Sequence, residues 1–402
     1  MSSALTVAEA PDPAPFSTTL ATSEPVDPCA YQQPESLTER FILVSLIGTT
    51  VALISIVENS FLSFILLRRK SHRSSHLLYL GLLAVCDVFM ACAYIPLMSA
   101  NILADMIQSP TILMYWYSYF RPMITISHIA MTASSYLIVA ATFERYLLTV
   151  RPERTSFLNR NRMRIAIGAI TLGVLTKFSH ALEFEVTKTA ECAGTMNYMM
   201  INLSELARVP TYNTLWRFFF RNFFTVYVPF SLLAFMNIRI VCVIHRSRYL
   251  FDSLEGTDAK RKTKIREATR TLVMVVFSYL LSNVLNVAVT IWEYVDNEGL
   301  LGEFITFYTY SVDIISLLTV FAGTLRLPIY LSCQSQLRRE IHFYFNVLWH
   351  GRDPSYQQAP HTHQTDFVKL CPDHSGAVLL SRNSMNIGDS HPAFRSLTPS
   401  GY

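Results

Sequence analysis

Seven apolar segments, each long enough to cross a lipid bilayer, constrain this sequence more than any other feature. They lie at about 41–67, 77–99, 112–147, 163–184, 215–245, 268–293 and 304–331. A spanning helix needs about 20 mostly apolar residues, and in lipid a helix satisfies its own backbone hydrogen bonds. The composition agrees, because only 15% of the residues are charged, whereas soluble domains have about 25%. We therefore predict an all-α membrane protein built as a seven-transmembrane-helix bundle.

The distribution of Lys and Arg between these segments predicts the orientation of the chain. The connections after the first, third and fifth segments are rich in them, whereas the connection after the fourth contains only Lys188 and Arg208. Since cytoplasmic loops carry the excess of basic residues, we expect an extracellular N-terminus and a cytosolic C-terminus in the plasma membrane. The triplet Asn202-Leu203-Ser204, an acceptor pattern for N-glycosylation, then falls in an outer loop.

The segments that flank the bundle differ from it in composition. We divide the chain into an extracellular arm (1–37), the bundle (38–332), an amphipathic helix (333–350) and a cytosolic tail (351–402). The arm and the tail are rich in Pro and Ser and lack a sustained period, so we expect both to be disordered. No basic start followed by an apolar core is visible, which argues against a cleavable signal peptide.

The short stretch after the seventh segment has an amphipathic pattern. Leu337, Ile341, Phe345 and Leu348 would share one face of a helix, with basic residues elsewhere. Such helices lie on the lipid of the inner leaflet. Cys333 at its start could carry a palmitoyl group or be an ordinary cytosolic cysteine.

Among the polar residues within or at the end of the apolar segments, we single out four: Asn59, Asp87, Arg145 and Arg326. A charged group at the centre of a bilayer costs about 2.5–3.5 kcal/mol on insertion scales. These residues could serve only to hold helices together. Because they lie on four separate segments at compatible depths, we favour a conformational switch.

Several motifs carry a resemblance to a known family. They are Asn59, Leu83-Ala84-Val85-Cys86-Asp87, Glu144-Arg145-Tyr146, Pro229 and Tyr330 followed by Leu337. Over residues 38–350 the chain resembles the rhodopsin-like G-protein-coupled receptors. This resemblance implies a cell-surface receptor that activates a heterotrimeric G protein and recruits arrestin through a phosphorylated tail.

Other positions depart from the family pattern. The third segment lacks its usual cysteine, the fourth has no Trp, and Arg326-Leu327 stands where the seventh usually has Asn-Pro. The sixth segment reads Tyr279-Leu280-Leu281-Ser282-Asn283-Val284-Leu285-Asn286, with Trp292-Glu293 further on. This variant resembles the invertebrate FMRFamide-type neuropeptide receptors.

The resemblance also implies roles for individual residues. Arg326 replaces a neutral amide that would face Asp87, so we predict an Asp87–Arg326 ion pair that occupies the family's sodium pocket. The alternative is that Arg326 extends elsewhere. At rest Arg145 would be held by Glu144. The residues predicted to act in switching or coupling are Asn59, Asp87, Glu144, Arg145, Tyr146, Pro229, Asn283, Arg326 and Tyr330.

Among the seven cysteines only Cys29 and Cys192 lie in segments predicted to be extracellular, where disulfides persist. They could pair and fix the arm across the mouth of a pocket, or both could remain thiols.

The outer surface is predicted to be acidic and aromatic, which suits a cationic ligand with aromatic groups, such as an amidated Arg-Phe peptide. The candidate pocket residues are Trp116, His128, Trp292, Glu293 and Asp313. His128 could equally form a hydrogen bond between helices. No signature of a small-amine receptor is present.

Other function classes have less support. There is no His-Glu-x-x-His pattern and no second acid at mid-membrane to pair with Asp87, so we expect neither an enzyme nor a metal site. No cofactor or nucleic acid is implied. A transporter or channel remains an alternative, although no repeated half is visible, and so does a receptor for a non-peptide ligand.

Overall fold

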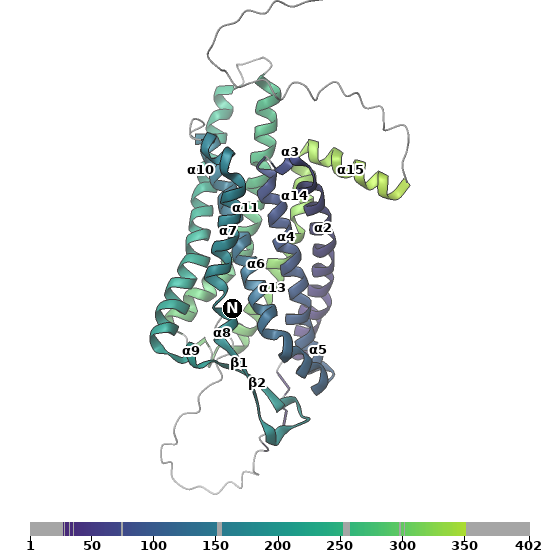
Figure 1. Ribbon diagram of the computed structural model, residues 1–402, viewed down its shortest axis with the longest axis vertical. Helices are drawn as coiled ribbons and strands as arrows, with labels where there is room; N and C mark the ends of the chain where they lie inside the picture. The colour runs from purple at the N-terminus through teal and green to yellow at the C-terminus, as the bar shows by residue number, and fades with distance from the viewer. Residues whose placement is uncertain are drawn as a thin grey trace, which may run out of the picture. The chain divides into compact units, whose positions relative to one another are not determined.

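A computed structural model of the protein describes residues 27–350, apart from 28, 32, 35, 74, 151–154, 252–257, 297–298 and 301. Within these residues seven helical spans are long and apolar enough to cross a membrane. They are Leu37–Arg68, Leu77–Met106, Pro110–Val150, Arg160–Glu183, Tyr212–Val243, Arg266–Val295 and Ile305–Cys333. Each overlaps one predicted segment, so the predicted seven-helix fold is confirmed (Figure 1).

The spans consist of shorter helical elements. The first three contain α1 (Leu37–Arg40), η1 (Phe41–Gly48), α2 (Thr49–Arg68), α4 (Leu77–Tyr94), η2 (Ile95–Ser99), α5 (Ala100–Met106) and α6 (Pro110–Val150), with α3 (Lys70–Arg73) between the first and second. The others contain α7 (Thr155–Lys177), α8 (His180–Glu183), η6 (Tyr212–Arg221), η7 (Phe223–Tyr227), α10 (Val228–Phe251), α11 (Asp258–Val295), α13 (Ile305–Thr324) and α14 (Arg326–Cys333). The amphipathic helix is α15 (Ser335–His350).

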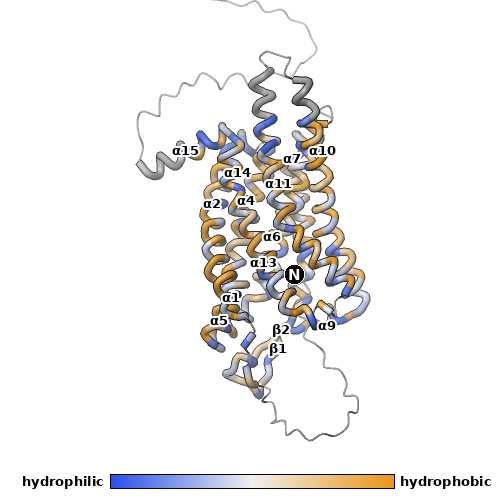
Figure 2. The backbone as a smooth tube through the Cα atoms, turned by 180° about the vertical axis from the view of Figure 1, so that it is seen from behind, coloured by the Kyte–Doolittle hydropathy of each residue, from blue (hydrophilic) through white to orange (hydrophobic). Residues whose placement is uncertain are grey.

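The bundle buries one side of each helix and exposes apolar residues on the other. Leu62, Leu83, Leu137, Val276 and Tyr330, from five different spans, belong to one buried core. Large apolar side chains such as Val57, Leu175 and Leu281 are exposed on the outside, and hydrophobic residues continue along the spanning helices (Figure 2). An exposed apolar surface of this length fits a lipid bilayer.

Two prolines accompany π-helical turns. Pro96 lies inside η2, and Pro229 lies two residues after the end of η7, in the first turn of α10. Because proline has no N–H, it cannot donate the usual bond to the carbonyl four residues earlier. The chain accommodates this loss with wider turns, which commonly occur as local bulges at functional sites.

A two-stranded sheet that the sequence analysis did not predict lies between the fourth and fifth spans. β1 (Phe184–Lys188) pairs antiparallel with β2 (Met199–Leu203), with Phe184 opposite Leu203. Two 3-10 turns, η4 (Ala190–Cys192) and η5 (Met196–Tyr198), lie between the strands, and α9 (Glu205–Arg208) follows. We call this end of the bundle the hairpin end.

The hairpin is joined to the segment before the first helix. Cys29 and Cys192 form a disulfide with their Cα atoms 5.2 Å apart, so the pairing that the sequence left open is present. The side chain of Asn197 also donates a hydrogen bond to the carbonyl of Ala30 at 3.1 Å. The chain before α1 is therefore fixed beside the hairpin.

The chain divides into two compact units, Met1–Phe345 and Asn346–Tyr402. In the first unit α15 buries Leu337 and Ile341, which confirms part of its predicted apolar face. The predicted tail (351–402) with its phosphorylation sites lies outside the described residues, and so do residues 1–26 of the predicted arm.

Candidate functional site

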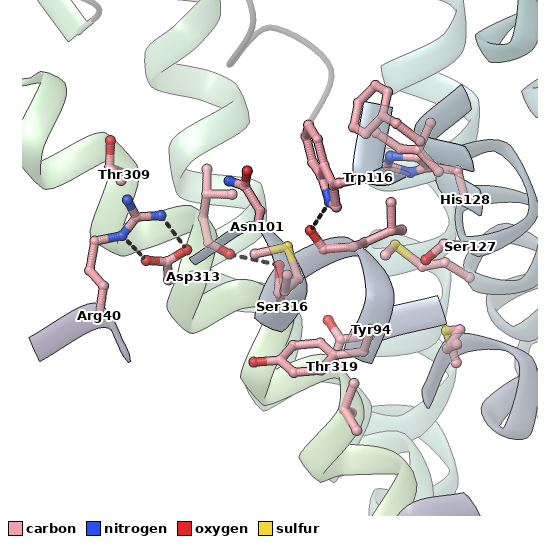
Figure 3. A pocket seen from close by; sticks show the side chains of 18 of the residues that line it. Arg40, Tyr94, Asn101, Trp116, Ser127, His128, Thr309, Asp313, Ser316 and Thr319 are labelled. Atoms are coloured by element: carbon pink, nitrogen blue, oxygen red, sulfur yellow. Dashed lines mark hydrogen bonds and ion pairs between the residues drawn. The ribbon is translucent and has the colours of Figure 1, made fainter. Parts of the chain in front are cut away.

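A cavity of about 290 Å³ lies at the hairpin end between the first, second, third and seventh spans (Figure 3). Its wall is mostly apolar, with contributions from Tyr94, Phe120 and Val320. The polar groups that line it are Arg40, Asn101, Ser127, His128, Thr309, Asp313, Ser316 and Thr319. A mostly apolar hollow with a few converging polar groups is the usual form of a ligand site.

The only ion pair among the described residues that line this cavity joins Arg40 and Asp313. Arg40 donates from Nε to Oδ2 at 2.7 Å and from Nη2 to Oδ1 at 3.2 Å. The Asp313 side chain is 1% exposed. Two parallel bonds of this kind match the planar guanidinium to the carboxylate. Asp313, a predicted pocket residue, therefore lies in the cavity with a guanidinium already bound.

Two further predicted pocket residues line the same cavity. Trp116 is buried and donates from Nε1 to the carbonyl of Leu97 at 3.1 Å. His128 is also buried, and its ring stacks on that of His180 with the centroids 4.5 Å apart. His128 therefore lines the cavity, and its contact with the other element is ring stacking rather than the hydrogen bond between helices that was the alternative.

The last two predicted pocket residues are not among those that line this cavity. Glu293 is buried and accepts a hydrogen bond from the hydroxyl of Tyr308 at 2.5 Å. Trp292 packs against Phe304 and Phe307. These contacts join the sixth span to the seventh, so Glu293 and Trp292 belong to that interface rather than to the site of Asp313.

A second charged cluster, which the sequence analysis missed, lies where the fourth span meets the fifth. The side chain of Glu183 is fully buried and pairs with Arg221. Tyr212 also donates to it at 2.9 Å, and Arg217 lies 3.9 Å away. The available signal was the pair Arg217 and Arg221, four residues apart in an apolar segment, since such cations need a buried partner.

The predicted ion pair between the second and seventh spans is present. Arg326 donates to Oδ2 of Asp87, and both side chains are buried. Gly323 lies beside them, where an added Cβ would meet Ser55 Oγ at 3.3 Å. Asn59 donates to the carbonyl of Gly323 at 3.2 Å. The structure thus brings the predicted residues of the first, second and seventh spans into one cluster. Tyr330, one turn after Arg326 in the seventh span, is also buried.

The prediction that Glu144 holds Arg145 is wrong. The carboxylate of Glu144 instead accepts two hydrogen bonds from Nε of Arg162 at 2.9 and 3.1 Å and one from Nη2 at 2.6 Å. Neighbouring residues on a helix point in different directions, so Glu144 can face Arg162 of α7 without contacting Arg145. Arg145 is buried, and its Nε has no partner among the described residues.

His76, just before α4, lies close to these cations. Burial lowers its pKa well below the usual value, and the charges of Arg145, Arg162 and His72 act in the same direction. The imidazole is therefore neutral at physiological pH. It adds no charge beside Arg145.

The remaining predicted residues have mixed outcomes. Asn283 donates to the carbonyl of Tyr279 in its own helix at 2.9 Å, and Tyr146 is partly buried against the core. Asn202 lies in β2 and donates to Thr187 at 2.7 Å. The thiol of Cys333 is buried, so a palmitoyl group could be attached only after a local opening of α14.

Comparison with known proteins gives a family assignment. The model of the 7 transmembrane receptor (rhodopsin family) matches residues 58–322. A search of curated proteins found no match. The family match covers more than half of the chain and contradicts the transporter or channel alternative. The protein therefore belongs to the rhodopsin family of seven-transmembrane receptors, and it is a signalling receptor rather than an enzyme.

Proposed function

We propose that this protein is a plasma-membrane receptor whose hairpin end faces outward and binds a cationic peptide, with activation of a heterotrimeric G protein. The observation that carries this proposal is the buried carboxylate of Asp313 in the cavity. Its bidentate contact with Arg40 demonstrates that this carboxylate has the space and geometry for a guanidinium. A ligand guanidinium that replaced Arg40 would meet the same two oxygens.

The charge distribution supports this orientation. Lys and Arg are concentrated in the connections at the end opposite the hairpin, as expected for the cytosolic side. The disulfide between Cys29 and Cys192 lies at the hairpin end, and disulfides persist outside the cytosol. Asn202 lies on the same hairpin and is the proposed glycosylation site.

The volume of the cavity restricts how a peptide could bind. At about 290 Å³ it is at the lower limit for a small-molecule site. It can take one or two side chains, and the rest of a peptide would lie over the hairpin. A terminal Arg-Phe amide fits, since its guanidinium would reach Asp313 and its ring would meet the apolar wall near Trp116 and Phe120. The same volume favours a small non-peptide cation as the second candidate.

At the opposite end we assign coupling to the region of Arg145. The ion pair of Glu144 with Arg162 joins the third span to the fourth, so Arg145 can contact a partner without first leaving Glu144. Ser335 in α15 donates to both oxygens of Glu267 in α11 at 3.1 Å. Opening of this end would have to break that contact. Arrestin binding to the phosphorylated tail is part of the same proposal.

The test is a G-protein dissociation assay in cells that express the full chain, challenged with a panel of peptides ending in amidated Arg-Phe. We expect a response that Arg145→Ala abolishes and that Asp313→Asn weakens at least about thirtyfold in potency, since losing one partner of a buried charge pair costs at least about 2 kcal/mol. Asp296→Asn is the matched control, because Asp296 is an exposed acid at the same end.

The outcomes separate the parts of the proposal. No response to any of these peptides, from a chain verified at the cell surface, would contradict the peptide class. An equal response from Asp313→Asn would contradict the assigned site. A response to small cations alone, lost in Asp313→Asn, would establish the second candidate.

A further inference from the structure

A second, smaller cavity shares only Met131 with the lining of the ligand site. It has a volume of about 30 Å³ and is enclosed by residues of α6, α7, η7, α10 and α11. This space holds one or two water molecules, or one ion of similar size. Its polar lining includes Lys177, Thr132, Ser135, Thr225 and Asn286.

The Lys177 side chain places a positive charge in this enclosed space. Lys177 is 7% exposed, and among the described residues no carboxylate lies within 4 Å of its ammonium group. Two nearby charges act on the Lys177 ammonium. The negative charge of Glu183 attracts it, and the positive charge of Arg221 repels it. Glu183 is itself bound to Arg221. The charge of Lys177 is therefore not neutralised by the surrounding side chains.

Burial of an unpaired ammonium group is strongly unfavourable. Lys177 is the last residue of α7, and the partial negative charge at a helix C-terminus offsets only a small part of that penalty. A glycine also brings it inward, because an added Cβ at Gly173, one turn earlier, would lie 2.9 Å from the backbone nitrogen of Ala133. The close approach of α7 to α6 thus directs Lys177 into the bundle.

A second group in the cavity also lacks a partner. The Thr225 side chain is 6% exposed, and its hydroxyl has no hydrogen-bond partner among the described residues. A buried hydroxyl of this kind normally finds a partner. Ser135 and Tyr279 bond to each other at 2.7 Å, so they complete the polar wall. An ammonium group and an unpaired hydroxyl donor facing one small space match the requirements of an anion.

We propose that this cavity binds a chloride ion, held by the ammonium of Lys177 and the hydroxyl of Thr225. The volume fits a single monatomic ion rather than a carboxylate with its substituent. Such an ion would contact the third, fourth, fifth and sixth spans together. It would therefore stabilise the described arrangement of these helices, independently of the ligand that binds near Asp313.

The experiment compares thermal unfolding of the full-length, detergent-solubilised protein in sodium chloride and sodium gluconate at equal ionic strength, with choline chloride to separate the effect of sodium. We expect chloride from either salt to raise the midpoint by a few degrees with saturation, as a ligand of the folded state does. Lys177→Met should abolish the chloride effect, and Thr225→Val should weaken the apparent chloride affinity severalfold. Lys188→Met, which changes an exposed lysine of β1, should leave it intact.

Equal midpoints in chloride and gluconate would overturn the proposal, and so would a chloride effect that persists in Lys177→Met. If Lys177→Met does not yield folded protein, Thr225→Val decides, because an unchanged chloride affinity in that variant contradicts the assigned ligand set. A crystal of the wild-type protein grown in bromide provides the direct readout. We expect an anomalous bromide peak beside Lys177. If other bromide sites in the same crystal are fully occupied and no peak appears beside Lys177, the result would also count against the site.

Discussion

Breaking the ion pair between Asp87 and Arg326 should be among the most destabilising single changes in the bundle. Arg326 is 4% exposed and Asp87 2%. Apart from its bond to the carboxylate, the Arg326 side chain also donates from Nη1 to the carbonyl of Leu83 at 3.4 Å. Asp87→Asn therefore leaves a buried guanidinium without its counter-charge, a loss that costs about 3–5 kcal/mol.

The magnitude depends on which partner is removed. Arginine cannot lose its proton, whereas a carboxyl group can gain one, so Asp87→Asn should cost more than Arg326→Met. One oxygen of Asp87, Oδ1, has no partner among the described residues, which places the loss near the lower limit of about 3 kcal/mol. At about 2–4 °C per kcal/mol, the midpoint should fall by about 6–12 °C. The double variant Asp87→Asn/Arg326→Met removes both charges and should recover most of this loss.

The native cysteines provide the assay. Cys86, next to Asp87, and Cys333 are buried, whereas Cys92 and Cys242 are exposed. Among the described free cysteines, a thiol-reactive fluorophore will therefore label Cys92 and Cys242 at once and Cys86 and Cys333 only on unfolding. If Asp87→Asn unfolds within about 2 °C of the wild type, or if the double variant is less stable than both single variants, the reasoning about the buried pair is refuted.

Three further changes test other contacts of the structure. Arg162→Gln should destabilise the protein by about 3 kcal/mol in thermal unfolding, because it leaves the fully buried carboxylate of Glu144 without its cation. Cys29→Ser should cost about 2–5 kcal/mol, because the disulfide with Cys192 closes a loop with a sequence separation of 163. For Glu340, burial alone would raise its pKa, but the hydrogen bond and charge of His72 and the charge of Arg69 together lower it. The contact of Glu340 with α3 is therefore fully stabilising above the usual pKa of 4.5 and is lost as the pH falls below it, which amide hydrogen exchange of α15 will measure.

Each of these has a matched control. Arg164→Gln removes an exposed arginine of α7 and should have little effect, so an equal loss from both variants would contradict a specific role for Arg162. Reductant should lower the midpoint of the wild type but not that of Cys29→Ser/Cys192→Ser. Glu340→Gln should abolish the pH dependence of exchange in α15, and a dependence that persists would assign it to another group.

The fold could be predicted because it follows from the length and apolar character of seven segments. The ion pair of Asp87 with Arg326 could also be predicted, because the family resemblance places Arg326 where a neutral amide would face Asp87. The pairing of Cys29 with Cys192 was open because nothing in the sequence fixes the segment around Cys29. The structure holds that segment against the hairpin through Asn197.

The contacts that could not be predicted depend on how helices face one another. Glu144 lies next to Arg145 in the sequence, yet it pairs with Arg162 because α6 turns that side toward α7. Asp313 pairs with Arg40, 273 positions away, and no pattern in the sequence joins these two residues. Glu183 lies at the end of the fourth segment, and only its burial against Arg221 reveals its structural role.

The pairing of Arg40 with Asp313 has a consequence for sensitivity, if the proposed site is the ligand site. Arg40 belongs to helix α1 of the same chain, so its guanidinium competes with a ligand cation as an intramolecular partner. Every ligand must first displace this internal competitor, which lowers its apparent affinity. The threshold concentration at which the receptor responds is then determined by a residue of its own first helix.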